Sequence, residues 1–94
     1  MKVKIRVFAR LRELMKNREL EVELEDGATV NELLRKLVEI YGEKLKEYLF
    51  SMDGSLKNHF VIYINGVGLK EAGGICRILR NGDVVAILPP ISGG

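Results

Sequence analysis

The chain has 94 residues, 47% of them hydrophobic and 30% charged, which predicts one globular domain. Fifteen Lys and Arg against thirteen Asp and Glu leave a formal charge of +2, too little to predict a nucleic-acid-binding protein. No apolar stretch approaches the ~20 residues of a membrane span, and the N-terminal segment lacks the continuous apolar centre of a signal peptide, so we expect a cytoplasmic protein with no membrane contact.

Two strands with oppositely charged faces are predicted near the N-terminus. Residues 2–7 alternate Lys and Arg with Val and Ile, and residues 19–25 alternate Glu with Leu and Val. Opposite charges on exposed faces would pair across an antiparallel ladder and help to set its register. We therefore expect a first hairpin, with an irregular segment over residues 11–18.

A helix is predicted to begin at Val30. Thr29 and Glu32 have the spacing of a capping box, and Gly42 is suited to the left-handed residue that ends a helix. Between them, apolar residues recur every three or four positions and form one face. A second, shorter helical segment is predicted around residues 45–49.

The second half of the chain predicts two apolar strands, over residues 60–64 and 84–88, each next to a turn. No structure is assigned to residues 67–80. Because the strand over 84–88 is apolar on both faces, we expect it at the centre of the sheet. The order of elements predicts an α+β fold with one main helix packed on one face of a mixed sheet.

The six residues after this last strand predict a projecting tail. Pro89 and Pro90 hold the backbone extended and lack N–H donors, so the segment cannot continue a central strand pairing. At about 3.1 Å per residue the tail could reach roughly 19 Å from the domain. Gly93 and Gly94 have no Cβ and could enter a narrow passage in another protein. The alternative is an ordinary frayed terminus.

Four segments together resemble the small, sulfur-carrying subunit of molybdopterin synthase, and the last of them is the most specific. They are residues 8–14 (FARLREL), Thr29-Val30 with Leu33, residues 61–66 (VIYING) and residues 81–94 (NGDVVAILPPISGG). The resemblance covers nearly the whole chain. It implies a single ubiquitin-like β-grasp domain over residues 1–94, with residues 89–94 as a flexible Gly-Gly tail.

The same resemblance implies a function for the tail. A ubiquitin-activating-type adenylyltransferase would use ATP to adenylate Gly94, and a sulfur donor protein would convert it to a thiocarboxylate. The large synthase subunit would then receive Gly93 and Gly94 and pass the sulfur to cyclic pyranopterin monophosphate, building the dithiolene of the molybdenum or tungsten cofactor. The chain itself would carry the reacting atom, bind no cofactor and not be an enzyme alone.

A partner-binding surface is expected where the last strand ends. The family position equivalent to Leu88 packs on partner proteins, although the family often has Phe there, and often an acidic residue at the position of Val84. We expect Leu88 to form an apolar patch with Val67 or Leu69. The arm that enters the partner would consist of Pro89, Pro90, Ile91 and Ser92.

The remaining candidates for chemistry are weaker. His59 has no cluster of Cys, Asp or Glu at ligand spacing, so no metal site is predicted. Cys76 is a lone cysteine, which is more often a small buried hydrophobe than a nucleophile. The basic residues of the first 18 positions are offset by glutamates and lack interleaved aromatic residues, so no RNA surface is predicted.

Three alternatives to molybdopterin synthesis remain open. The chain could be a protein modifier joined to lysines through Gly94, or a sulfur carrier for thiamine or transfer-RNA thiolation, because acyl adenylation serves all of these. It could also be a plain β-grasp interaction domain whose tail has no role. The final acceptor, the choice of molybdenum or tungsten, and the oligomeric state do not follow from the sequence.

Overall fold

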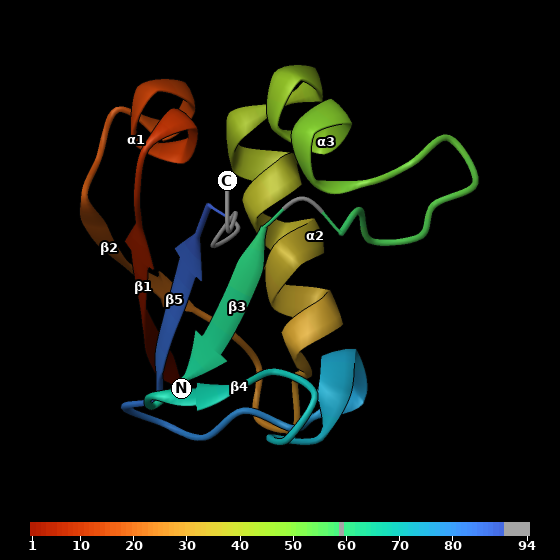
Figure 1. The fold of residues 1–94 in the computed structure, drawn as a ribbon. Helices are drawn as coiled ribbons and strands as arrows, with labels where there is room; N and C mark the ends of the chain where they lie inside the picture. Colours follow the sequence, from red (N-terminus) through yellow and green to blue (C-terminus); the bar gives the residue numbers. More distant parts are fainter. Residues whose placement is uncertain (59, 90–94) are drawn as a thin grey trace.

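The computed structural model describes residues 1–58 and 60–89, which form a five-stranded sheet with one long helix across one face (Figure 1). In chain order the elements are β1 (Lys2–Val7), α1 (Arg10–Met15), β2 (Glu19–Glu23), α2 (Val30–Tyr41), α3 (Glu43–Leu49), β3 (Val61–Ile64), β4 (Val67–Gly68), the 3-10 turn η1 (Gly74–Cys76) and β5 (Val84–Leu88).

The strand order in the sheet is β2-β1-β5-β3-β4. β5 pairs parallel with β1 and antiparallel with β3, and it is the central strand. This is the ubiquitin-like β-grasp arrangement with a mixed sheet, as the sequence predicts. Because β5 is parallel to β1, its carboxyl end lies at the same end of the molecule as α1 and α3 (Figure 1).

The predicted charge ladder joins β1 to β2. The strands are antiparallel, with Arg6 opposite Glu19 and Lys4 opposite Glu21. Arg6 Nε donates to a Glu19 carboxylate oxygen at 2.7 Å, and Lys4 Nζ lies 3.7 Å from the other oxygen. The hydrogen bond from Arg6 and the nearby cations hold the pKa of Glu19 below its ordinary value. These groups are exposed, so their main effect is on register.

The connection between these strands is not irregular as expected, because it contains α1. Leu11 and Met15, four residues apart, are both buried by this short helix. The usual start signal is missing. Ala9 at the N-cap makes no side-chain hydrogen bond and has a φ of 51°. Without a cap, only the spacing of Leu11, Leu14 and Met15 could have predicted the helix.

Helix α2 has the predicted bounds. Thr29 Oγ1 accepts a hydrogen bond from the Glu32 N–H at 3.2 Å, and Gly42 ends the helix at a φ of 90°. The buried face of the helix packs on the buried face of the sheet. The residues of this core include Val30, Leu33, Leu34 and Leu37 of α2 and Val3, Ile5, Val7, Val22, Ile62, Ile64, Val85 and Ile87 of the strands.

The predicted second helix is α3, which buries Leu45 and Leu49. The predicted strand over residues 60–64 is β3, which begins one residue later at Val61. The unassigned segment contains the two-residue strand β4 and the turn η1. No helix in the described part of the chain is long and apolar enough to cross a membrane.

Candidate functional site

The site is built around the carboxyl end of β5. Leu88 is half-buried and pairs with Val61 of β3, and Pro89 after it is exposed. Because β5 has a hydrogen-bonded strand on each side, its end is held at a fixed place in the sheet. Pro90, Ile91, Ser92, Gly93 and Gly94 lie outside the described residues.

A group of hydrogen bonds fixes the other end of β5. The Asn65 side chain accepts from the Val84 N–H at 2.9 Å and donates to Asp83 Oδ1 at 2.9 Å. Asp83 Oδ2 also accepts from the Arg80 N–H at 2.8 Å. The turn after β3 and the turn before β5 are thereby tied together. A shift of β5 along its axis would break these bonds.

Asp83 is ionised in this group. Its side chain is largely buried, with Arg77 Nη2 at 3.6 Å. Burial is the largest single influence and favours the neutral acid. The hydrogen bonds from Asn65 and Arg80 and the charge of Arg77 together outweigh it, so the pKa of Asp83 lies below its ordinary value.

The sheet face turned away from α2 has an apolar centre, which we call the open face. By strand alternation it presents Leu88, Ala86 and Val84 of β5 beside Val61 and Tyr63 of β3, all half-buried. On the other side of β5 the exposed cations Lys4 and Arg6 of β1 face the same way. An apolar centre with a polar rim is the usual composition of a protein-binding surface.

Two residues near the end of β1 extend this surface, and the sequence analysis did not select them. Phe8 follows β1 directly and is half-buried, and the Arg12 guanidinium lies 5.0 Å from the centre of its ring. Arg12 Nε also donates to the Val7 carbonyl at 3.0 Å, which holds it in place. Since Val7 pairs with Ile87, both residues lie near the exit of β5. The sequence signal for these two residues was an aromatic side chain and a cation within the segment 8–14.

The structure does not place Val67 beside Leu88, so the expected patch of these two residues is wrong in its geometry. Val67 pairs with Ile64, and Ile64 also pairs with Val85, three positions before Leu88. The turn after β3 therefore leaves Val67 at the opposite end of the sheet. Leu69 donates its N–H to the Ile62 carbonyl and is half-buried against the core rather than on the open face.

The other candidates contribute little to this site. Cys76 is exposed, not buried as expected. His59 lies outside the described residues. Among residues 1–58 and 60–89, no three His, Cys, Asp or Glu side chains are grouped so that they could hold a metal ion.

Comparisons with known proteins agree with the fold. Residues 5–94 match the ThiS family. Small archaeal modifier protein 3 of Haloferax volcanii is 33% identical over the full length of both chains. A putative sulfur carrier protein of Archaeoglobus fulgidus is 37% identical over 76 residues, 81% of this chain and 84% of that protein. The structure of a putative molybdopterin converting factor subunit 1 from Pyrococcus furiosus matches with a TM-score of 0.77 and 34% identity, over 96% of this chain and 98% of that one.

Proposed function

The chain belongs to the ThiS family of small ubiquitin-like sulfur carriers and modifiers, and on that premise we propose that it carries sulfur as a thiocarboxylate on Gly94. We propose further that the sulfur goes to the dithiolene of the molybdenum or tungsten cofactor. The main structural support for the sulfur-carrier proposal is the central position of β5 in the sheet. The carboxyl end of β5 is fixed there, and the exposed Pro89 connects it to the final residues that resemble the synthase subunit.

The proposed chemistry takes place on Gly94 and is catalysed by partners. A carboxylate is a poor acyl donor, so an adenylyltransferase joins it to the α-phosphate of ATP and releases pyrophosphate. The terminal sulfur of a persulfide on the donor protein then displaces AMP to form an acyl disulfide, and a second thiol cleaves its S–S bond by disulfide exchange and releases the thiocarboxylate. In the large synthase subunit, this sulfur attacks the pterin precursor, and hydrolysis of the resulting thioester leaves the sulfur on the pterin and returns Gly94 to a carboxylate. The chain contributes delivery, because binding of the domain places the reacting atom within the partner's active site.

The open face is the proposed docking surface for these partners. Leu88 with Val61 and Tyr63 would bury apolar area, while Arg12 beside Phe8 would supply a cation near the exit of β5. The arm of Pro89, Pro90, Ile91 and Ser92 would lie in the partner's cleft, and Gly93 would pass its narrowest part. Val67 and Leu69 are left outside this surface.

Protein modification is the second candidate, and the full-length similarity to a small archaeal modifier protein favours it. Here the same adenylate of Gly94 would be attacked by a lysine ε-amine and form an isopeptide bond. The two functions share the adenylation of Gly94 and diverge at the nucleophile that displaces AMP. They therefore differ in the product that accumulates, which is a thiocarboxylate on Gly94 for the carrier and an isopeptide bond for the modifier.

Deletion of Gly94 tests the proposal. With ATP, the activating enzyme and a sulfur donor, the intact chain should gain the mass of one oxygen-to-sulfur exchange on its last residue. The truncated chain ends in a similar carboxylate placed about 3 Å short, so thiolation and dithiolene formation should both collapse. If the truncated chain supported both as well as the intact one, the sulfur-carrier mechanism would be wrong. Lysine conjugates without dithiolene formation would instead support the modifier function.

A further inference from the structure

Strand β2 is the outer strand of the sheet on the side away from β3, and its free edge presents backbone groups. Leu24 and Met1 exchange two hydrogen bonds of 2.8 Å, and at the other end of the ladder the Val7 N–H donates to the Arg18 carbonyl at 2.9 Å. Hydrogen-bonded and non-bonded pairs alternate along an antiparallel ladder. Every second residue of β2 therefore directs its N–H and C=O away from β1.

The residues with outward backbone groups are the glutamates, Glu19, Glu21 and Glu23. All three are exposed. Glu19 is paired with cations of β1, whereas Glu21 and Glu23 have no ion-pair partner among residues 1–58 and 60–89. The free edge thus combines unpaired backbone donors and acceptors with two carboxylates that form no ion pair within the described residues.

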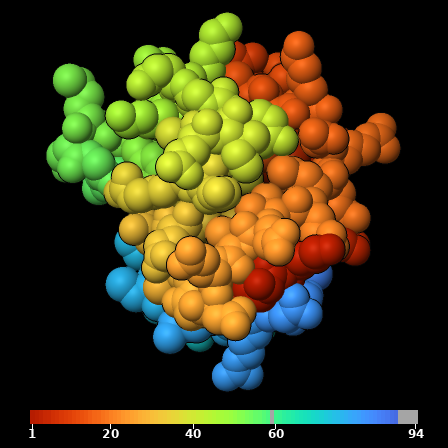
Figure 2. Space-filling view, turned by 180° about the vertical axis from the view of Figure 1, so that it is seen from behind, coloured from red at the N-terminus to blue at the C-terminus, as the bar shows by residue number. Residues whose placement is uncertain are grey.

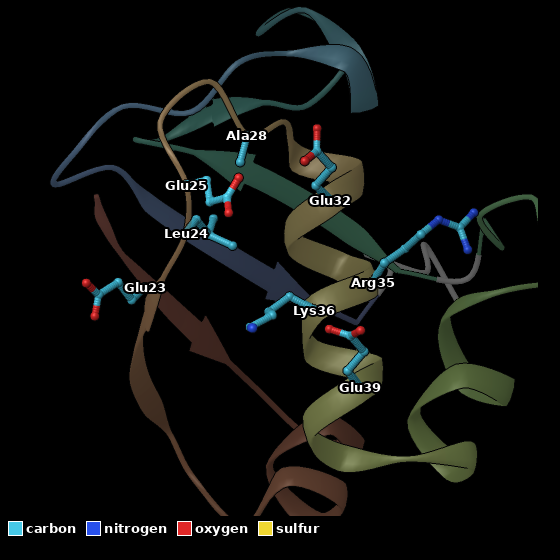
Figure 3. A pocket seen from close by; sticks show the side chains of 8 residues that line it. All are labelled: Glu23, Leu24, Glu25, Ala28, Glu32, Arg35, Lys36 and Glu39. Atoms are coloured by element: carbon cyan, nitrogen blue, oxygen red, sulfur yellow. The ribbon is translucent and has the colours of Figure 1, made fainter.

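On the α2 side, this edge continues into an open groove of about 570 Å³ (Figure 3). Leu24 and Ala28 come from the segment after β2, and the polar side chains of α2 line the other wall. Figure 2 shows the same side of the molecule, with α2 in yellow beside the orange segment that follows β2. The groove has four carboxylates and two cations, in a chain whose net charge is +2.

We propose that the free edge of β2 binds an extended segment of a partner protein in which basic residues alternate with aliphatic ones. Such a segment would add a strand to the sheet. Its basic side chains would lie beside Glu21 and Glu23, and its aliphatic side chains would lie on the α2 side, over Leu24 and Ala28. The chain contains a segment of this kind, since β1 alternates in the same way and already pairs with the inner edge of β2.

The acidic edge argues against a second copy of this chain as the occupant. Joining two β2 edges would place glutamates against glutamates, and charged side chains are one of the ways in which edge strands avoid self-association. The edge is also separated from β5 by β1, so this surface goes beyond the proposed function and does not depend on Gly94.

The test uses a peptide with the sequence of residues 2–7, acetylated and amidated, titrated into the full-length isotopically labelled chain. We expect shifts and slower hydrogen exchange at the amides of Glu19, Glu21 and Glu23. The amides of Leu20 and Val22 should keep their exchange protection, since the peptide adds to β2 and does not replace β1. A peptide with its Lys and Arg changed to Glu should not bind, and binding of both peptides with equal affinity would overturn the proposal.

Three variants separate the backbone contribution from the charge. Glu21→Pro removes an outward N–H without breaking the β1 ladder and should weaken peptide binding about tenfold. Glu21→Gln with Glu23→Gln should weaken it about threefold to tenfold at low salt and reduce its salt dependence. Glu43→Gln with Glu47→Gln on α3 is the matched control and should leave affinity unchanged.

Several results would refute the edge site. The site is refuted if a folded Glu21→Pro chain binds the peptide as tightly as wild type. It is also refuted if the α3 control loses as much peptide affinity as the β2 variants. Shifts of β2 amides with protein concentration alone would identify a second copy as the occupant and also overturn it. If Glu21→Pro does not fold, the test rests on the peptide affinity of the Glu21→Gln, Glu23→Gln variant and on the hydrogen exchange of the wild-type β2 amides. All variants should still form the Gly94 thiocarboxylate, so failure here is distinct from failure of the sulfur-carrier proposal.

Discussion

Replacing Asp83 with asparagine tests whether the turn before β5 stabilises the fold as its geometry indicates. Asp83 accepts from the Asn65 amide and the Arg80 N–H with different oxygens, at 2.9 and 2.8 Å, and lies 3.6 Å from Arg77. Asparagine has the same shape but one acceptor oxygen and no charge. One of the two donors would therefore face the new NH₂ group.

The expected loss of stability follows from these contacts. A donor left without an acceptor in a largely buried place costs about 1–3 kcal/mol. The lost attraction to the partly exposed Arg77 adds about 0.5–1 kcal/mol. We expect Asp83→Asn to lower the free energy of unfolding by about 2–3 kcal/mol and the Tm by about 10–20 °C.

The same variant should show a defined pH dependence. The pKa of Asp83 is lowered in the folded chain, so its ionised form stabilises folding. This contribution is complete above the pKa of an unfolded aspartate, about 3.9, and is lost as the pH falls through the lower pKa of the folded state. The gap between wild type and Asp83→Asn should be widest near neutral pH and narrow below about pH 4. Glu19 and Asp53 also have lowered pKa values, but they titrate alike in both chains.

Urea unfolding of both chains at neutral and acid pH measures these effects. Asp53→Asn is the matched control, because Asp53 is exposed and accepts from the N–H and hydroxyl of Ser55 within its own turn. It should change the free energy of unfolding by less than about 0.5 kcal/mol. Equal midpoints for wild type and Asp83→Asn at neutral pH, or a gap that does not narrow in acid, would refute the reasoning.

Three further predictions concern the exit of β5 and the end of α2. Leu88→Asp should weaken binding to the activating enzyme at least about tenfold in a titration while the chain stays folded. The control Ile78→Asp, at an exposed position away from the open face, should leave that affinity unchanged. Unchanged affinity of Leu88→Asp would remove Leu88 from the docking surface. Deleting residues 91–94 should leave the Tm nearly unchanged, and a large fall would show that these residues pack against the domain. Gly42→Ala should lower the free energy of unfolding in urea by about 1 kcal/mol, because φ is 90° at this position. A Cβ there would meet open space, so the loss would come from the backbone conformation and not from a clash. No loss of stability would mean that the end of α2 can rearrange.

The elements predicted correctly from sequence are those with a long or repeated pattern. The bounds of α2 follow from Thr29 and Gly42, which act as the cap and stop that their positions indicate. The central place of β5 follows from its lack of charge on either face. Helix α1 was missed because it has six residues and begins after Ala9, whose positive φ and missing cap give no start signal.

The site was predicted less completely than the fold. Placing Leu88 near Val67 required knowing where the chain goes after Asn65 and Gly66, both of which have positive φ. The tight turn sends β4 back beside Ile64, away from the end of β5. Phe8 and Arg12 were visible as residue types, but their place near Leu88 depends on the parallel pairing of β1 with β5, which joins distant parts of the sequence.

That pairing links the position of the carboxyl end of β5 to completion of the whole fold. Lys4 lies opposite Val84, so closing the centre of the sheet brings together positions about 80 residues apart, a long loop that makes folding slow and cooperative. In a partly folded chain β5 would not be held between β1 and β3, and the open face around Leu88 would not form. An activating enzyme that docks on this face would therefore select finished molecules, and the fraction of chains that can be adenylated should equal the fraction that is folded.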